Sequence, residues 1–253
     1  MGSELGEMAS RELISVLEHD PELGQGLAPE RLLDARRQTR AAIMDVVSDL
    51  PTAWPAEVRS GLGLLVLDGL LLRRVGVDGR FGAELLGRGE VLRPWQIEDT
   101  GNSISPTSGW RVLQGAQIAL LDLDFTRRIA PYPEIHAQLL ARAIRRSRYL
   151  ALSLAIMHHP KVETRLHMLL WHLADRWGRV HPDGVHLPVK LTHVILSELV
   201  GARRPTVSAA LGAIERDGRV SRNGSGWILH GSPPGGMGEL LAPDAPTANE
   251  PHS

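Results

Sequence analysis

The feature that most constrains this chain is a pair of short helical patterns joined by a glycine. Residues 191–201, LTHVILSELVG, predict a short helix that Thr192 caps and Gly201 closes. Residues 204–216, RPTVSAALGAIER, predict a second helix, because proline is tolerated in a first helical turn and marks its beginning. Their apolar residues form one shared core: Leu196, Leu199, Val200, Val207, Ala210, Leu211 and Ile214. The stretch therefore predicts a compact helix-turn-helix.

The flanking segments extend this unit on both sides. Residues 162–178, VETRLHMLLWHLADRWG, predict an amphipathic helix with four leucines on one side, followed by the turn HPDG at 181–184. Residues 218–231, GRVSRNGSGWILHG, alternate around an Asn-Gly/Ser-Gly turn and predict a two-stranded hairpin. A preceding helix, two short helices and a hairpin make a winged helix-turn-helix, which we expect over residues 160–231.

The second short helix begins with two cations, although the helix dipole favours anions at that end. Either Arg203 and Arg204 are simply solvated, or this end binds a polyanion. If the polyanion is DNA, Arg203 suits a phosphate and Arg204 a bidentate guanine contact, with Ala209 against a thymine methyl. Thr206 and Ser208 then donate to phosphates or base edges. The predicted DNA-binding set is Arg203, Arg204, Thr206, Ser208, Ala209 and Arg222.

Charge distribution supports such a partner better than net charge does. The 253 residues carry a formal net charge of −1, yet residues 160–232 hold ten Lys or Arg against six Asp or Glu, a local +4 that leaves about −5 elsewhere. The chain has no cysteine, which excludes disulfides and thiolate metal sites and favours the cytoplasm. The acidic N-terminus lacks the features of a signal peptide, and the most apolar run, LGLLVLDGLLL, is too short to span a membrane.

The N-terminal half has a different character. Between residues 24 and 132 glycines separate short apolar runs, which predicts the strands and turns of a roll, with VDGR at 77–80 as a tight hairpin. Residues 134–159 contain no Gly or Pro and predict one long helix. Its apolar stripe either packs on its own domain or forms a dimer seam. The residues of that stripe are Leu140, Ile144, Ala151 and Leu154.

These patterns predict an α+β chain with five segments. They are an N-terminal segment 1–23, a β-roll sensor-like domain 24–132, a dimerisation helix 133–159, a winged helix-turn-helix 160–231 and a tail 232–253. The tail contains five prolines and little that is apolar, which predicts disorder.

The C-terminal motifs resemble the DNA-binding domain of the Crp/Fnr family of bacterial transcription regulators. The resemblance rests on HPDG at 181–184 and on the helix-turn-helix and hairpin of 191–231. More weakly, LLVLDGLLLRR at 64–74, LLGRGEVL at 85–92 and the segment 110–146 resemble the cyclic-nucleotide-binding β-roll and its exit helix. The resemblance implies a homodimer on inverted-repeat DNA, with RNA polymerase and a small-molecule effector as further partners.

Two departures from the family qualify what the resemblance implies. Members that bind cyclic nucleotides hold the phosphate with an Arg-Ser or Arg-Thr pair, whereas Thr107 stands at the arginine's place here. We therefore expect no ordinary cAMP site, and either a degenerate pocket or one for another ligand. The candidate pocket residues are Arg93, Trp95, Thr107, Ser108 and Trp110, with core packing as the alternative for the tryptophans. Pro205 and Ala209 replace a glutamate and an arginine of the family's recognition helix, so its usual half-site is not expected.

Other function classes have less support in the sequence. Six of the eleven histidines fall between 158 and 186, but no HExxH occurs, and His167 and His172 are five residues apart. We expect structural histidines, no metal, no cofactor, no catalytic residue and no enzyme. The alternatives are a histidine-metal hydrolase and a partner-binding regulator that keeps the fold without binding DNA.

Overall fold

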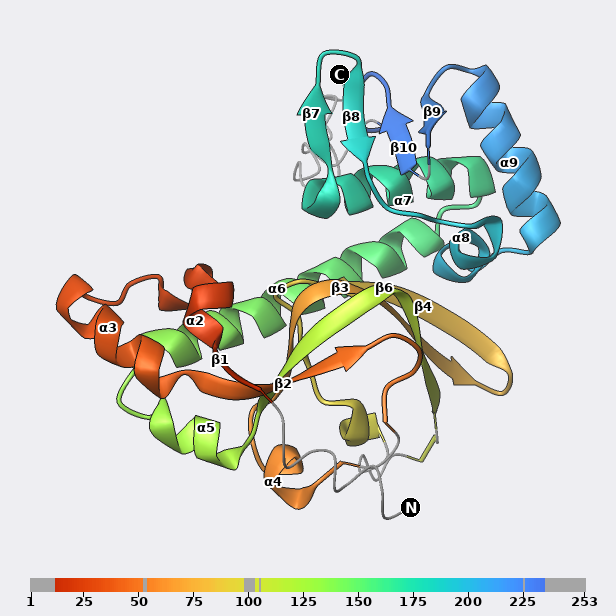
Figure 1. Cartoon of the computed structure of the whole chain (residues 1–253). Coiled ribbons are helices and arrows are strands. Elements are labelled where there is room, and N and C mark those ends of the chain that lie inside the picture. Colours follow the sequence, from red (N-terminus) through yellow and green to blue (C-terminus); the bar gives the residue numbers. More distant parts are fainter. Residues whose placement is uncertain (1–11, 52–53, 98–102, 105, 225, 235–253) are drawn as a thin grey trace, which may run out of the picture. The chain divides into compact units, whose positions relative to one another are not determined.

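The computed structural model describes residues 12–51, 54–97, 103–104, 106–224 and 226–234. The chain divides into two compact units, residues 1–154 and 155–253 (Figure 1). The predicted tail falls mostly outside the described residues, so its disorder stays a prediction.

The first unit is built on a six-stranded antiparallel sheet with strand order β1-β2-β6-β3-β4, in which β5 also pairs with β3. The strands are β1 (Leu13–Ser15), β2 (Arg40–Val46), β3 (Gly63–Val77), β4 (Arg80–Gly87), β5 (Val91–Leu92) and β6 (Thr107–Leu121). The register of β3 against β6 shifts around Asp68 and Leu70, where Gly69 has a φ of +92° and a Cβ would lie 2.4 Å from the Ala116 Cα. These irregularities bend the long strands into the predicted roll.

The predicted VDGR hairpin is confirmed. β3 and β4 pair from Leu70 and Gly87 to Val77 and Arg80. Asp78 and Gly79 connect them with positive φ values of 51° and 72°, as a two-residue hairpin turn requires.

Short helices accompany the sheet of the first unit. They are α2 (Val16–His19), η2 (Pro21–Gly24), α3 (Pro29–Gln38), α4 (Ala56–Arg59), η3 (Pro94–Ile97) and α5 (Leu123–Arg128). The prediction of strands and turns for residues 24–132 is wrong over Pro29–Gln38, which form the helix α3. Pro29 lies in the first turn of this helix, and Arg36 and Arg37 lie in its last turn, where the helix dipole favours cations.

The long helix α6 (Pro133–Met157) confirms the helix predicted at 134–159 to within two residues at its end. One face is buried in the first unit through Ile135, Leu139 and Arg142. Arg142 makes a two-point ion pair with Asp20, with nitrogen–oxygen distances of 2.5 and 2.8 Å, while Arg146 binds Glu84 at 2.6 Å. Arginines as well as apolar side chains therefore anchor this helix.

The opposite face of α6 carries the predicted apolar stripe. Leu140, Ile144 and Leu154 are 62%, 47% and 56% exposed, and Ala151 is also exposed. The first unit leaves about half or more of the surface of Leu140, Ile144 and Leu154 uncovered, and the dimer seam stays a prediction.

The second unit combines three helices with a four-stranded antiparallel sheet of order β7-β8-β10-β9. Its elements are α7 (Val162–Trp177), β7 (Arg179–His181), β8 (Gly184–Leu187), α8 (His193–Leu199), α9 (Arg204–Arg216), β9 (Val220–Asn223) and β10 (Gly226–Leu229). The predicted hairpin is present as β9 and β10, and β8 extends it by pairing with β10. HPDG lies at the β7–β8 turn, whose strands the sequence analysis did not predict. The two units together confirm the α+β fold class.

Candidate nucleic-acid interface

The helix-turn-helix is positioned by a cap, a glycine and a shared core. The Thr192 side chain accepts a hydrogen bond from the Ile195 N–H at 3.3 Å and opens α8. Gly201 has a φ of +60°, and the Ala202 N–H closes the turn on the Ser197 carbonyl at 3.0 Å. The buried core comprises Leu196, Leu199, Val200, Val207, Ala210, Leu211 and Ile214, as predicted.

The opposite side of α9 presents polar and cationic groups. Arg203 occupies the N-cap position, and Pro205 lies in the first turn. Arg203, Arg204, Thr206 and Ala209 are all exposed. No acidic residue lies in this first turn. Free backbone N–H groups, a positive dipole end and two arginines therefore coincide, which is an arrangement that suits an anion.

Ser208 and Arg222, the other two residues of the predicted DNA-binding set, both contact a histidine that the sequence analysis missed. His193 Nδ1 lies 2.7 Å from Ser208 Oγ, and an Arg222 terminal nitrogen lies 3.0 Å from His193 Nε2. Arg222 also donates from Nε to Glu215 at 3.1 Å, and its guanidinium lies 3.8 Å from the centroid of the buried Trp227 ring. Nothing in the spacing of residues 193, 208 and 222 points to this contact, since it depends on how the helices and the wing pack.

Histidines on the wing sheet form a second group. The rings of His181 and His186 stack at 4.1 Å, and His186 Nε2 lies 2.8 Å from an Asp183 oxygen. This hydrogen bond lowers the pKa of the Asp183 carboxyl below its ordinary value. These contacts join β7 to β8 across the HPDG turn.

The histidines of α7 lie in the core of the second unit. His167 accepts a hydrogen bond from Trp171 Nε1 at 3.1 Å and is buried, as is His172. Burial lowers the pKa of His167, and the positive charge of Arg219 lowers it further. Among the residues that the structure describes, no group of three or more potential ligands is placed to hold a metal.

Three of the five predicted effector residues gather at one core cluster. Arg93 lies 5.8 Å from the centroid of the Trp95 ring, and Trp110 packs against the cluster that contains Trp95. Trp95 is buried beside Trp54, with ring centroids 5.7 Å apart, and Arg93 donates to the Arg59 carbonyl at 2.8 Å. Trp110 is half-buried. Thr107 and Ser108 are exposed at the start of β6. Part of the intervening loop, residues 98–102 and 105, is outside the described residues, so the pocket stays a prediction.

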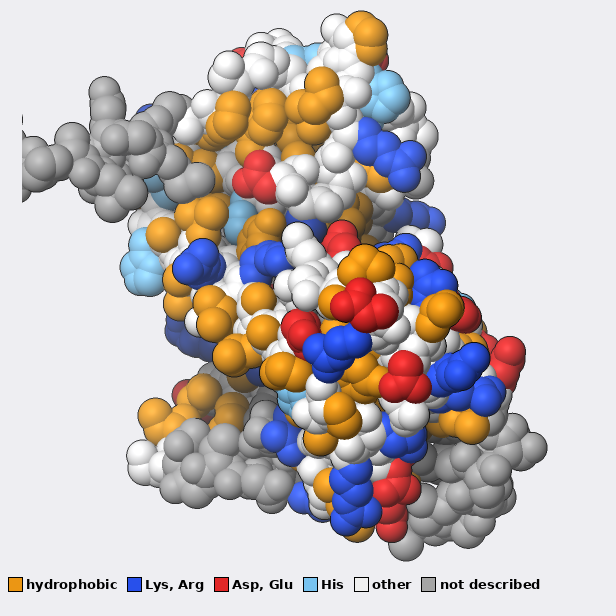
Figure 2. Space-filling view, turned by 90° about the vertical axis from the view of Figure 1, so that its left-hand side faces the viewer, with side chains coloured by type: hydrophobic (Ala, Val, Ile, Leu, Met, Phe, Trp, Pro, Cys, Tyr) orange, Lys and Arg blue, Asp and Glu red, His pale blue; other side chains and the backbone are white. Residues whose placement is uncertain are grey.

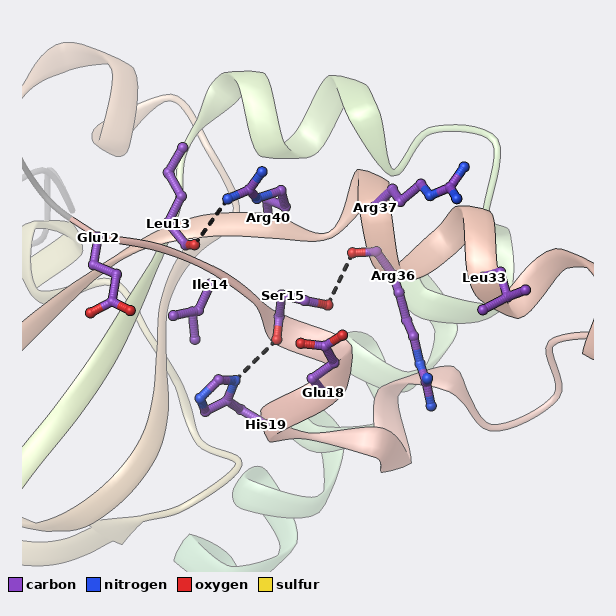
Figure 3. A pocket seen from close by; sticks show the side chains of 10 residues that line it. All are labelled: Glu12, Leu13, Ile14, Ser15, Glu18, His19, Leu33, Arg36, Arg37 and Arg40. Carbon is purple, nitrogen blue, oxygen red and sulfur yellow. Dashed lines mark hydrogen bonds between the residues drawn. The ribbon is translucent and has the colours of Figure 1, made fainter.

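A separate pocket, which none of those five residues lines, lies beside the edge strand β1. It has a volume of about 550 Å³ and is shown in Figure 3. Its charged lining residues are Glu12, Glu18, Arg36, Arg37 and Arg40. Ser15 Oγ donates to the Arg36 carbonyl, and Arg40 donates to that of Leu13. In the view of Figure 2, the described residues show acidic, basic and apolar side chains intermixed.

Comparison with known proteins finds similarity to Crp-like regulators. Residues 164–231 match the model of the Crp-like helix-turn-helix domain. A curated relative, the CRP-like cAMP-activated global transcriptional regulator of Mycobacterium tuberculosis, is 28% identical over 173 residues, which cover 68% of this chain and 76% of the relative. Among the described residues, no helix is a candidate for spanning a membrane.

Solved structures share the fold at lower identity. A cyclic nucleotide-binding domain containing protein from Listeria monocytogenes has a TM-score of 0.62 at 16% identity, covering 83% of this chain and 96% of that one. A CooA mutant from Carboxydothermus hydrogenoformans has a TM-score of 0.57 at 16% identity, covering 75% and 83%. Residues 164–231 therefore match a Crp-like helix-turn-helix domain, the chain is similar to a CRP-like transcriptional regulator, and its fold is that of the Crp-type solved structures.

Proposed function

We propose that this chain binds double-stranded DNA sequence-specifically through α9, as a homodimer on an inverted-repeat operator. The observation that carries the proposal is the exposed N-terminal end of α9, where Arg203, Arg204, Thr206 and Ala209 face outward while Val207 and Ala210 are buried. DNA supplies the anion that both the dipole and the guanidinium groups favour.

The proposed contacts differ between the arginines. Arg204, on the first turn of α9, is assigned to the two acceptors of a guanine edge. Arg203, at the N-cap, is assigned to a phosphate, which fixes position and carries no sequence information. Thr206 and Ser208 donate to phosphates or base edges, and Ala209 contacts a thymine methyl. Arg222 uses two of its five N–H donors within the domain and keeps others for a phosphate.

The homodimer proposal rests on the exposed stripe of α6. Leu140, Ile144, Ala151 and Leu154 follow spacings of four, seven and three residues, which place them along one face of a 25-residue helix. A second copy of the same helix covers that stripe with like side chains. A two-fold dimer then reads half-sites about one helical turn, roughly 34 Å, apart. We place this activity in the cytoplasm with the DNA, with RNA polymerase as a further partner.

We also propose that cAMP is not the effector, although the mycobacterial relative is named as cAMP-activated. Thr107 stands where the resemblance requires an arginine, and it is exposed on strand β6. A threonine hydroxyl replaces neither the charge nor the two-point geometry of a guanidinium. A different small molecule, or none, then controls this chain.

Salt-titrated fluorescence anisotropy on a selected operator tests the DNA assignment. We expect Arg204→Ala to cost about 1–3 kcal/mol and to relax the preference at one position per half-site. Arg203→Ala should weaken all sequences alike and reduce the salt slope by about 0.9 per protomer. Arg216→Ala is the matched control, because Arg216 is exposed at the other end of the same helix. If neither Arg203 nor Arg204 matters, the domain is better described as a protein-interaction module.

A further inference from the structure

His193 lies between two residues of the proposed DNA-binding surface, Ser208 on α9 and Arg222 on β9. We propose that His193 is a positioning residue for DNA reading, which leaves Ser208 a hydrogen-bond donor and holds Arg222 in place on the wing. The inference rests on the proposed function, because it concerns how that surface reads DNA.

The chemistry of the three groups fixes the direction of both hydrogen bonds. A guanidinium only donates, so His193 Nε2 accepts from Arg222 at 3.0 Å. In a neutral imidazole the other nitrogen then carries the proton, so Nδ1–H donates to Ser208 Oγ at 2.7 Å. Ser208 therefore uses a lone pair on His193 and retains its own hydroxyl hydrogen.

A hydroxyl that donates outward favours base edges that offer an acceptor. Guanine O6 and N7, adenine N7 and thymine O4 accept such a bond, whereas the amino group of cytosine does not. Because the Nδ1–H of His193 occupies one lone pair, the Ser208 hydroxyl hydrogen cannot turn toward the histidine and is left to donate to another acceptor, whereas a serine without this partner rotates freely. His193 thus contributes to base preference without itself contacting a base.

Arg222 is held in place by contacts with three elements of the domain, one of which comes from His193. Arg222 is held by His193 of α8, by Glu215 of α9 at 3.1 Å and by the Trp227 ring of β10 at 3.8 Å. Each contact removes rotational freedom from a long side chain before DNA arrives, which reduces the entropy lost on binding. The wing arginine and the Ser208 hydroxyl are therefore arranged by one imidazole.

The first test examines the free protein. Two-bond nitrogen–proton NMR of the imidazoles, with His193→Gln used to assign the resonance, should show His193 protonated at Nδ1 and not at Nε2. The Nε2–H tautomer would overturn the inference whatever the protein does with DNA.

The second test measures base preference with purified full-length variants in competition anisotropy. His193→Leu removes both bonds, His193→Gln keeps one donor and one acceptor, and Ser208→Ala removes the hydroxyl. His193→Leu and Ser208→Ala should relax preference at the same base pair by about five- to tenfold. His193→Leu should add no further loss at that position in the Ser208→Ala background, and His193→Gln should retain the preference.

Uniform weakening of all sequences by His193→Leu, or additive losses at that position in the double variant, would overturn the positioning role while leaving DNA binding intact. A wild-type protein without any sequence preference would instead overturn the proposed function, and this inference with it.

Discussion

Replacement of Arg142 by alanine should destabilise the first unit more than replacement of an exposed arginine by alanine does. The Arg142 and Asp20 side chains are only 7% and 5% exposed, and they meet at 2.5 and 2.8 Å. Arg142→Ala leaves the Asp20 carboxylate buried without its partner, which costs about 3–5 kcal/mol. For a unit of this size that loss lowers Tm by roughly 6–20 °C.

Urea unfolding followed by tryptophan fluorescence and circular dichroism measures this loss. Arg127→Ala is the control, because the ion pair of Arg127 with Asp124 is about 70% exposed on both sides and should contribute less than about 1 kcal/mol. The double variant Arg142→Met/Asp20→Leu should recover most of the stability, since neither charge remains buried. A loss below about 1 kcal/mol for Arg142→Ala would refute the claim that this pair anchors α6.

Three further predictions concern the dimer, the effector and pH. Leu154→Arg should leave the Tm of the single chain nearly unchanged, because Leu154 is 56% exposed, but should make the protein monomeric by light scattering; a monomeric wild type would contradict the seam. Cyclic AMP should not bind with a micromolar Kd in calorimetry, and such binding would show that another cation replaces the missing arginine. Burial lowers the pKa of His167, so as pH falls below about 6.5 the unfolded chain takes up a proton before the folded chain does, and the free energy of unfolding should decrease. His167→Gln should flatten this dependence of the free energy of unfolding on pH, as measured by urea titrations. An unchanged dependence would exclude His167 as its source.

The second unit was the more predictable one from the sequence. Thr192, Gly201 and Pro205 are local signals whose effect depends on their immediate neighbours, and each is found at the expected helix end. The VDGR hairpin is predictable for the same reason. The spacing of apolar residues and the cap residues therefore identify α7, α8 and α9 before any tertiary contact is known. The alternating pattern around a turn does the same for the β9–β10 hairpin.

The contacts that the sequence did not reveal are long-range. His193 meets Arg222 across 29 residues, and Arg142 meets Asp20 across 122. Such pairings depend on how separate elements pack, and charged residues on an apparently solvated helix face give no sign of them. β7 and β8 are strands of three and four residues, too short to show a two-residue period.

We propose that α9 reads DNA in a dimer. This proposal is tested most directly by selecting bound duplexes from a random library with the full-length protein and with Arg204→Ala. We expect the wild type to enrich an inverted repeat with half-site centres about one helical turn apart, and Arg204→Ala to lose one preferred guanine in each half-site. Failure of the wild type to enrich any sequence, or an identical motif from Arg204→Ala, would contradict the proposal.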